Sequence, residues 1–532
     1  MSSASFAPIK NPQKEEYIAV CTTVKKAIKI HVIGCKSKAA ITDYTVAPDN
    51  IRAFLDGIST MFDSKKCKAI IFDIYKFKPA DHECPHVINF CYQIRAKLDE
   101  MQIKHFFYAD RSIFLSGLLI SSKINSSKGD TVLFLLVKDD SILVLEYIYT
   151  DLGHQKIRKD TITVPAEAES WVEIRGKILA GSKPKNIIVF GVDMDLPIMK
   201  TLKKNIFVKE KLFFIGKKTL SSESVQHSLI ISKYVQDHGY TKFHVIPTCA
   251  KKYRVHCVDS LSHPFLAIEV GTQLLYKFED YVPRSCNAFC ITGFDENGEN
   301  EKLIYETVQE ENDRHRSKIT VVVDPESFPL LIIRPIIIDL IHELPAHLDK
   351  NHAEKIPVIV FCDNFSVICV YKDDEKKHHF LDGWNGEWGQ SLCISFDEEK
   401  PKFGQKAFEM VTTKPTFVIS DLIKIMSIPA EEIEQDQSWS FTVTKDSENP
   451  VLLQFDNFDG TKTAASPAFL MALLLKEHLK FIKIEIGKKA KKIAIYSLDY
   501  FNTAEKNRVE NGLKDACKLL NIDCCFLKTD PL

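Results

Sequence analysis

The sequence has almost no net charge, because 70 Lys and Arg residues are balanced by 71 Asp and Glu residues. Such a balance gives no electrostatic basis for binding nucleic acid or an anionic membrane surface. Long hydrophobic runs are also missing. The run FPLLIIRPIIIDLI (328–341) is interrupted by Arg334 and Pro335, and it is too short to span a bilayer. We therefore expect no nucleic-acid partner and no membrane association.

The N-terminal stretch MSSASFAPIKNPQKEEY is polar and lacks the apolar segment of a signal peptide. The 15 cysteines are scattered and contain no C-x-x-C pair, which fits reduced thiols in a cytoplasmic protein. The cluster His82-x-Cys84-x-His86 has no second pair of ligands at the spacing that zinc sites use. It favours the beginning of a helix over a metal site, and no metal is predicted.

Common catalytic signatures are absent. The sequence has no G-x-S-x-G elbow, Walker loop, H-E-x-x-H motif or dinucleotide fingerprint. Glycine is also absent from the turn of the apolar hairpin VLFLLVKDDSILVLEYI (132–148). Hairpins commonly turn on Gly or Asn-Gly, and phosphate-binding turns need Gly so that backbone N–H groups reach the ligand. The hairpin is either an ordinary surface turn or a nucleotide loop that has lost its chemistry.

Strands and helices alternate along much of the chain. The periodicity predicts a strand at 69–75, a helix at 86–101 and a strand at 103–109. Short β-like segments replace this pattern from about 253 to 340, and a polar connection follows at 343–355. We predict three domains: residues 1–240, 241–345 and 355–532.

An internal repeat links the two ends of the chain. Residues 45–110 and 463–530 both run turn, amphipathic helix, strand, aromatic loop, helix, strand and Asp. The large separation favours a duplicated domain piece over a solenoid, in which neighbouring repeats are contiguous.

The second copy resembles the start of the nucleotide-binding domain of the heat shock protein 70 family, on PVIVFCDNFSVICVYKDD (357–374), KFGQKAFEMVTTKPTFVISDLIKIM (402–426) and the unit at 463–530. Later family segments follow the first copy in the family's order. The resemblance is found in YADRSIFLSGLL (108–119), the hairpin at 132–148, NIIVFGVDMDLPIMKTL (186–202) and SSESVQHSLIIS (221–232). LLYKFEDYVPRSCNAFCIT (274–292) resembles the head of the peptide-binding β-sandwich.

The resemblance implies an α/β plus β chain, with an actin-like ATPase fold and a β-sandwich, peptide-binding-like insert. The order of the pieces is unusual. Residues 1–235 resemble a nucleotide domain that lacks most of its first lobe, with residues 17–34 as a remnant of the opening hairpin. Residues 355–532 resemble a first lobe alone. The simplest interpretation is a tandem pair of eroded copies; docking of the C-terminal lobe onto the N-terminal unit is left open.

The resemblance also implies positions for the nucleotide site. The first phosphate turn of the family corresponds here to Val360, Cys362, Asp363 and Asn364, and the second to Leu136, Lys138, Asp139, Asp140 and Ser141. The nucleoside loop corresponds to Gly191 and Val192, and the family's acid to Asp110 in one copy and Asp530 in the other. The catalytic lysine corresponds to Ile423, beside Lys424. Side chains replace the turn glycines, and Asp139 and Asp140 would repel a triphosphate. Each like-charge contact at about 4 Å costs about 1 kcal/mol even in water.

We therefore expect a fold retained without its reaction, with no intact catalytic residue and no cofactor. The leading hypothesis is a non-catalytic heat shock protein 70-like protein that binds unfolded or extended polypeptide, or other proteins, in a chaperone-related role. One alternative is an ATP-dependent chaperone that still binds ATP and Mg²⁺ through altered phosphate loops. Another is an interaction scaffold. The sequence leaves the client and the oligomeric state open.

Overall fold

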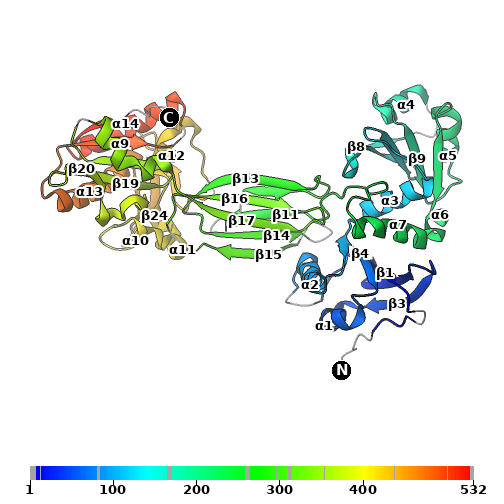
Figure 1. Ribbon diagram of the computed structural model, residues 1–532. Helices are drawn as coiled ribbons and strands as arrows, with labels where there is room; N and C mark the ends of the chain where they lie inside the picture. Colours follow the sequence, from blue (N-terminus) through cyan, green and yellow to red (C-terminus); the bar gives the residue numbers. More distant parts are fainter. Residues whose placement is uncertain are drawn as a thin grey trace.

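The computed structural model describes residues 8–527, except 12–13, 81–83, 165–170, 258–263, 295–297, 299, 310–312, 353, 437 and 500. Figure 1 shows two α/β lobes at the N-terminal end, a β-sandwich in the middle and a further α/β lobe at the C-terminal end. We call these the first lobe, the second lobe, the sandwich and the C-terminal lobe. Within the described residues, no helix combines the length and apolar character needed to cross a membrane.

The first lobe is built on a five-stranded sheet with the order β3-β2-β1-β4-β5. The first three strands are antiparallel, and β4 and β5 add in parallel. Alternate apolar side chains of β1 point to opposite faces, so Ala19 packs with α1 and α2 while Ile18 packs with α7. The elements are β1 (Tyr17–Val24), β2 (Ala27–Gly34), β3 (Ala40–Val46), α1 (Ile51–Met61), β4 (Cys67–Asp73), α2 (Val87–Glu100) and β5 (His105–Phe107).

The second lobe repeats this topology, with the order β8-β7-β6-β9-β10. The predicted hairpin at 132–148 is confirmed as the antiparallel pair β6 and β7. The elements are α3 (Asp110–Ser122), β6 (Thr131–Val137), β7 (Ser141–Thr150), β8 (Gly153–Thr163), α4 (Trp171–Leu179), β9 (Asn186–Gly191), α5 (Pro197–Thr201), β10 (Leu212–Gly216), α6 (Lys217–Ser222) and α7 (Ser224–Gln236).

The C-terminal lobe contains the same sheet a third time, with the order β20-β19-β18-β28-β29. The internal repeat is confirmed as structure: helix, fourth strand, helix and fifth strand follow one another in both copies. The second copy consists of α13 (Pro467–Ile486), β28 (Lys492–Ser497), α14 (Thr503–Leu519) and β29 (Asp523–Phe526). The first three strands are β18 (Val358–Cys362), β19 (Phe365–Lys372) and β20 (Lys377–Phe380).

The two copies differ in the segment between the third strand and the first helix. In the first lobe this segment is only residues 47–50, whereas in the C-terminal lobe it is residues 381–466. The first lobe therefore has all five strands of the sheet and lacks the counterpart of residues 381–466. The longer segment of the C-terminal lobe holds β21 (Gln390–Ser391), β22 (Ile394–Ser395), β23 (Lys402–Phe403), α10 (Gln405–Phe408), α11 (Met410–Thr413), β24 (Val418–Ile419), α12 (Leu422–Ser427), β25 (Thr442–Thr444), β26 (Leu452–Asp456) and β27 (Lys462–Ala465).

The β-rich segment forms two facing sheets, ordered β12-β11-β14-β15 and β13-β16-β17. Alternate residues of β16, among them Ile319 and Val321, are fully buried, as expected for a strand with one face on a core. The strands are β11 (Tyr253–Cys257), β12 (Leu266–Ile268), β13 (Tyr276–Pro283), β14 (Ala288–Phe294), β15 (Glu301–Val308), β16 (Arg316–Val323) and β17 (Pro329–Ile336).

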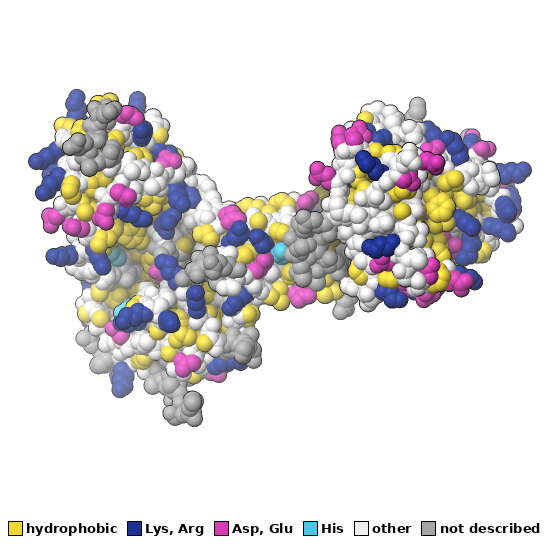
Figure 2. Space-filling model, turned by 180° about the vertical axis from the view of Figure 1, so that it is seen from behind, with side chains coloured by type: hydrophobic (Ala, Val, Ile, Leu, Met, Phe, Trp, Pro, Cys, Tyr) yellow, Lys and Arg dark blue, Asp and Glu magenta, His cyan; other side chains and the backbone are white. Residues whose placement is uncertain are grey.

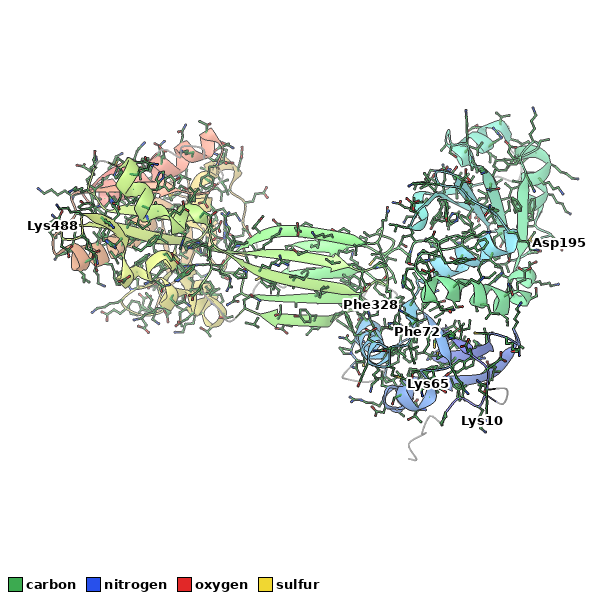
Figure 3. All side chains as sticks on the ribbon, in the orientation of Figure 1. Lys10, Lys65, Phe72, Asp195, Phe328 and Lys488 are labelled. Carbon is green, nitrogen blue, oxygen red and sulfur yellow. The ribbon has the colours of Figure 1, made fainter. Side chains whose placement is uncertain are left out.

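The turn between β16 and β17 inserts into the first lobe. Phe107 of β5 stacks on Phe72 at 4.4 Å between ring centroids and meets Phe328 of the turn at 5.2 Å, edge to face. Figure 3 shows Phe72 and Phe328 at this junction. The Phe107 N–H donates to Oε1 of Glu326 at 2.9 Å, and Arg95 pairs with Asp324 at 2.6 Å. The sandwich and first lobe consequently share one apolar core.

Two local expectations need correction. Residues 343–355 were expected to be a polar connection, but α9 (Leu344–Asn351) lies there, directly after α8 (Asp339–His342), and Leu344 and Leu348 of α9 are buried against the C-terminal sheet. His86 does begin a helix, since its side chain accepts the N–H of Ile88 at 3.3 Å, but it is buried rather than on the surface. His82 lies outside the described residues.

Candidate functional site

The turn between β18 and β19 is the candidate first phosphate turn. Asp363 occupies it with a positive φ of 49°, and the Asp363 N–H donates to a carboxylate oxygen of Asp499 at 2.7 Å. Asp499 lies just after β28, so two adjacent parallel strands bring these residues together. The chain's own carboxylate thus occupies the place at which a phosphate oxygen would accept this N–H.

The side chain of Asp363 is also bound within the chain. Its two carboxylate oxygens accept hydrogen bonds from Nε and Nη2 of Arg316 at 2.8 and 2.7 Å. Arg316 is the first residue of β16, so the partner comes from the sandwich. Both side chains are about one-fifth exposed. Such a bidentate pair combines charge with fixed geometry, and it joins the sandwich to the C-terminal lobe through the turn itself.

The other predicted residues of this turn are packed into the lobe. Val360 and Cys362 are buried in the apolar cluster under α9, so their side chains are not available to a ligand. The Asn364 side-chain carbonyl accepts the Asp421 N–H at 3.1 Å and thereby holds the beginning of α12. These residues have structural partners at the positions where the family resemblance implies phosphate contacts.

The β18–β19 turn is poorly suited to bind a metal ion. Cys362, Asp363 and Asp499 are the one group within the described residues whose ligand atoms lie close enough together to hold an ion. Arg316 already engages both oxygens of Asp363. Burial raises the pKa of the Cys362 thiol well above its usual range, so the thiolate that metals prefer is disfavoured. Burial also raises the pKa of Asp499 to about 6.

The lysine position does not restore the chemistry. Ile423 is buried among the residues of α12, α13 and α14. Lys424 instead pairs with Asp436 at 2.8 Å and lies 5.4 Å from the centre of the Trp439 ring. Its ammonium is therefore committed to a surface ion pair.

The turn between β6 and β7 is the candidate second phosphate turn. Lys138, Asp139 and Asp140 are exposed, and the Lys138 N–H donates to the Ser141 carbonyl at 2.9 Å, which closes the turn. The Asp140 carbonyl accepts the Val164 N–H at 3.0 Å, while Leu136 is part of the apolar face of the sheet. This arrangement is that of an ordinary surface hairpin.

The candidate nucleoside loop follows β9. A side chain at Gly191 would lie 2.0 Å from Cε of Met199 and 3.1 Å from the Asp193 carbonyl, so the segment folds closely onto itself there. Val192 is 68% exposed. The Asp195 N–H donates to the Asp193 carboxylate at 2.9 Å, and Figure 3 places Asp195 on the outer edge of the second lobe.

The two acid positions, Asp110 and Asp530, lie partly or wholly outside the described residues. Asp110 is the first residue of α3, directly after β5, but its side chain lies outside the described part of the structure, as does the whole of Asp530. The structure therefore places the backbone of one and neither carboxylate.

Sequence reasoning missed the side chains that dominate the C-terminal turn. Arg316 and Asp499 lie 47 residues before and 136 residues after Asp363, and neither has a local motif. A second arginine, Arg284, lies with its guanidinium 4.2 Å from the centre of the Phe365 ring, directly beyond the turn. The sequence around Arg316, RHRSKITVVV (314–323), gives no signal for this pairing.

No model of a known protein family matches the chain.

Proposed function

We propose that this chain is a non-catalytic relative of the heat shock protein 70 family that binds other proteins without a nucleotide cycle. Support for the architecture comes from the repeated strand order. The first lobe, the second lobe and the C-terminal lobe share one five-stranded topology, and the sandwich follows the second lobe, as the sequence resemblance implies. This supports an actin-like ATPase fold for the N-terminal pair of lobes and a lone first lobe at the other end.

The main support for the absence of catalysis is that side chains of this protein already bind the polar groups of the β18–β19 turn. A phosphate turn works by offering free N–H groups and water-bound metal to the ligand. Here the Asp363 N–H is bound by Asp499, and the Asp363 carboxylate is bound by Arg316. A nucleotide would have to displace two ionic groups before making its own contacts.

The protein-binding part is supported by the sandwich. β15 ends its sheet and pairs only with β14 among the described strands. Leu303, Tyr305 and Val308 of this strand are 45%, 46% and 57% exposed. Figure 1 shows β15 along one edge of the sandwich, and Figure 2 shows apolar side chains on the sandwich surface between the larger ends of the molecule. An open strand edge beside apolar side chains suits an extended polypeptide, which adds as a further strand.

The first lobe limits how much of this edge is open. Asn89 of α2 donates its side-chain N–H to the Ile304 carbonyl at 2.9 Å. The proposed binding region therefore begins beyond Ile304 and uses the Tyr305 and Val308 end of β15.

The test measures binding of the full-length protein to a reduced, carboxymethylated polypeptide that stays unfolded in buffer. Fluorescence anisotropy gives the affinity of the original protein and of the double variant Tyr305→Lys with Val308→Lys, two exposed residues of the proposed region. Burying an apolar side chain is worth about 1.5–3 kcal/mol, so we expect a loss of about tenfold or more. The matched control is Tyr281→Lys on β13, since Tyr281 is 57% exposed on the other sheet.

Three outcomes contradict the proposal. No binding by the original protein removes the chaperone-related role. Equal loss in the control and the double variant indicates a charge effect rather than the β15 edge. Release of the polypeptide by Mg-ATP favours the alternative of an ATP-dependent chaperone.

A further inference from the structure

A polar cavity of about 610 Å³ lies between the sandwich and the C-terminal lobe. Arg284, Asn287 and Arg314 line it from the sandwich, and Gln390, Ser391 and Gln405 line it from the C-terminal lobe. Strand β21, which carries two of these residues, pairs with the first residues of β19. The cavity therefore lies beside the β18–β19 hairpin, but its lining residues are distinct from the turn residues.

Arg284 is the central cationic group of this cavity. Its guanidinium donates to the carbonyls of Trp388 and Gly389 and packs over the ring of Phe365. None of these partners carries a negative charge, and no described carboxylate forms an ion pair with Arg284. Burial is the main cause that lowers the pKa of this guanidinium, to about 10, and Arg314 contributes in the same direction.

The rest of the lining fits an anion better than a cation. Arg314 is only 2% exposed, so a second positive charge lies within the protein next to the cavity. The uncharged lining residues are four amides, two serine hydroxyls, Gly389 and the ring of Phe408, and the amides and hydroxyls can donate hydrogen bonds. The two acidic lining residues, Asp313 and Glu409, are exposed, so water screens their charge.

We propose that this cavity binds a small molecule that carries an oxyanion group, a phosphate or a carboxylate, with Arg284 as the cationic group of the site. The charge of Arg284 is largely removed from water, and such a charge is costly unless an anion compensates it. A guanidinium presents paired N–H donors that match both kinds of oxyanion. The volume lies in the range of small-molecule sites, about 300–1,000 Å³, which favours an organic anion over a bare ion.

The experiment measures the thermal unfolding midpoint of the full-length protein against increasing inorganic phosphate, pyrophosphate and citrate. Each titration is paired with sodium chloride at the same ionic strength, because general screening also changes stability. We expect a midpoint that rises and saturates with at least one of the three anions. Comparing the rise with phosphate and pyrophosphate to the rise with citrate distinguishes a phosphate-bearing ligand from a carboxylate-bearing one.

Two pairs of variants locate the effect. Arg284→Gln removes the cation, and we expect it to weaken binding about tenfold or more, as for hydrogen bonds to charged groups. Its control is Arg334→Gln, an exposed arginine of β17 outside the cavity. Gln405→Glu adds a negative charge to the lining and keeps Arg284, so it tests the site even if Arg284→Gln impairs folding. Its control is Lys406→Gln, which makes the same change in net charge on the adjacent residue.

A saturating effect that Arg284→Gln or Gln405→Glu abolishes, and that both controls retain, supports the site. The proposal is overturned if no anion acts beyond matched salt, since the chain's own groups then satisfy the guanidinium. It is also overturned if the variants and their controls respond alike.

Discussion

Arg316 of the sandwich holds Asp363 of the C-terminal lobe by two hydrogen bonds, at 2.8 and 2.7 Å. The pair joins two domains at the turn where a phosphate-binding loop is expected from the sequence. The β18–β19 turn, which contains no glycine, therefore serves as the point at which the sandwich is attached to the C-terminal lobe.

Replacing Arg316 tests this attachment. We expect Arg316→Gln to lower the free energy of unfolding by about 2–3 kcal/mol, because one charged partner of a mostly buried pair is left behind. Urea denaturation followed by tryptophan fluorescence reports this loss, since three of the four tryptophans, Trp384, Trp388 and Trp439, lie in the C-terminal lobe. A double-mutant cycle with Asp363→Asn isolates the pair. A coupling energy near zero would show that the contact contributes nothing.

Gly389 provides a second test of the same junction. Its φ is 57°, and a Cβ there would lie 1.9 Å from the Ser366 carbonyl oxygen. We expect Gly389→Ala to cost about 3 kcal/mol, because backbone strain adds to a clash with backbone atoms. The control is Gly129→Ala, with φ of 89° and no atom near the added Cβ, for which we expect about 1 kcal/mol. Equal costs would mean that close packing at Gly389 is unimportant.

The junction of the first lobe and the sandwich is expected to depend on pH through Glu326. Burial is the main cause that raises the pKa of Glu326, to about 7, against a partly opposing effect of Arg95. The folded state therefore holds this proton more tightly than the unfolded state does. The resulting stability is complete below about pH 4.5 and is lost as pH rises through 7.

Glu326→Gln measures that contribution. The amide oxygen still accepts the Phe107 N–H, but the side chain no longer ionises. We expect the variant to resemble the original protein at pH 5 and to exceed it in unfolding free energy by about 2–3 kcal/mol at pH 8. Glu279→Gln, at an exposed residue of β13, is the control. A difference between variant and original protein that does not change with pH would contradict the assignment.

The helix α14 offers a local check on the repeated unit. Asn502 accepts the N–H groups of Ala504 and Glu505 at 2.9 and 3.0 Å, and Glu505 accepts the Asn502 N–H in return. We expect Asn502→Ala to lower the free energy of unfolding by about 1 kcal/mol. Asn502→Ser should recover most of this loss, because serine also caps helices; no recovery would exclude a capping role.

The repeat and the hairpins were predictable because they depend on local patterns. The alternation of apolar residues marked β6 and β7, and the order of amphipathic helix and apolar strand marked both copies of the repeated unit. The missing glycine at Lys138 to Asp140 left two interpretations of the turn open, and the hydrogen bond from Lys138 to Ser141 fits the ordinary surface hairpin.

The contacts between domains were not predictable in this way. Nothing near Arg316 in the sequence indicates that it meets Asp363, because the pairing depends on how the sandwich docks. The five-stranded sheet of the first lobe was not predicted, because the resemblance marked only residues 17–34 as its opening hairpin, whereas β3 and the two parallel strands complete the sheet. Residues 343–355 looked polar, although Leu344 and Leu348 of α9 share one helical face.

The most direct test of the central claim compares the unfolding midpoint of the full-length protein with and without Mg-ATP and Mg-ADP, at about 1–5 mM. A nucleotide present at about 100 times its dissociation constant adds about 2.7 kcal/mol to the stability of the domain that binds it. Pyrophosphate at the same concentration accounts for any anion effect at the Arg284 cavity. We predict no shift beyond that of pyrophosphate. A further rise of several degrees with either nucleotide would show that the phosphate turns still bind, and would contradict the account.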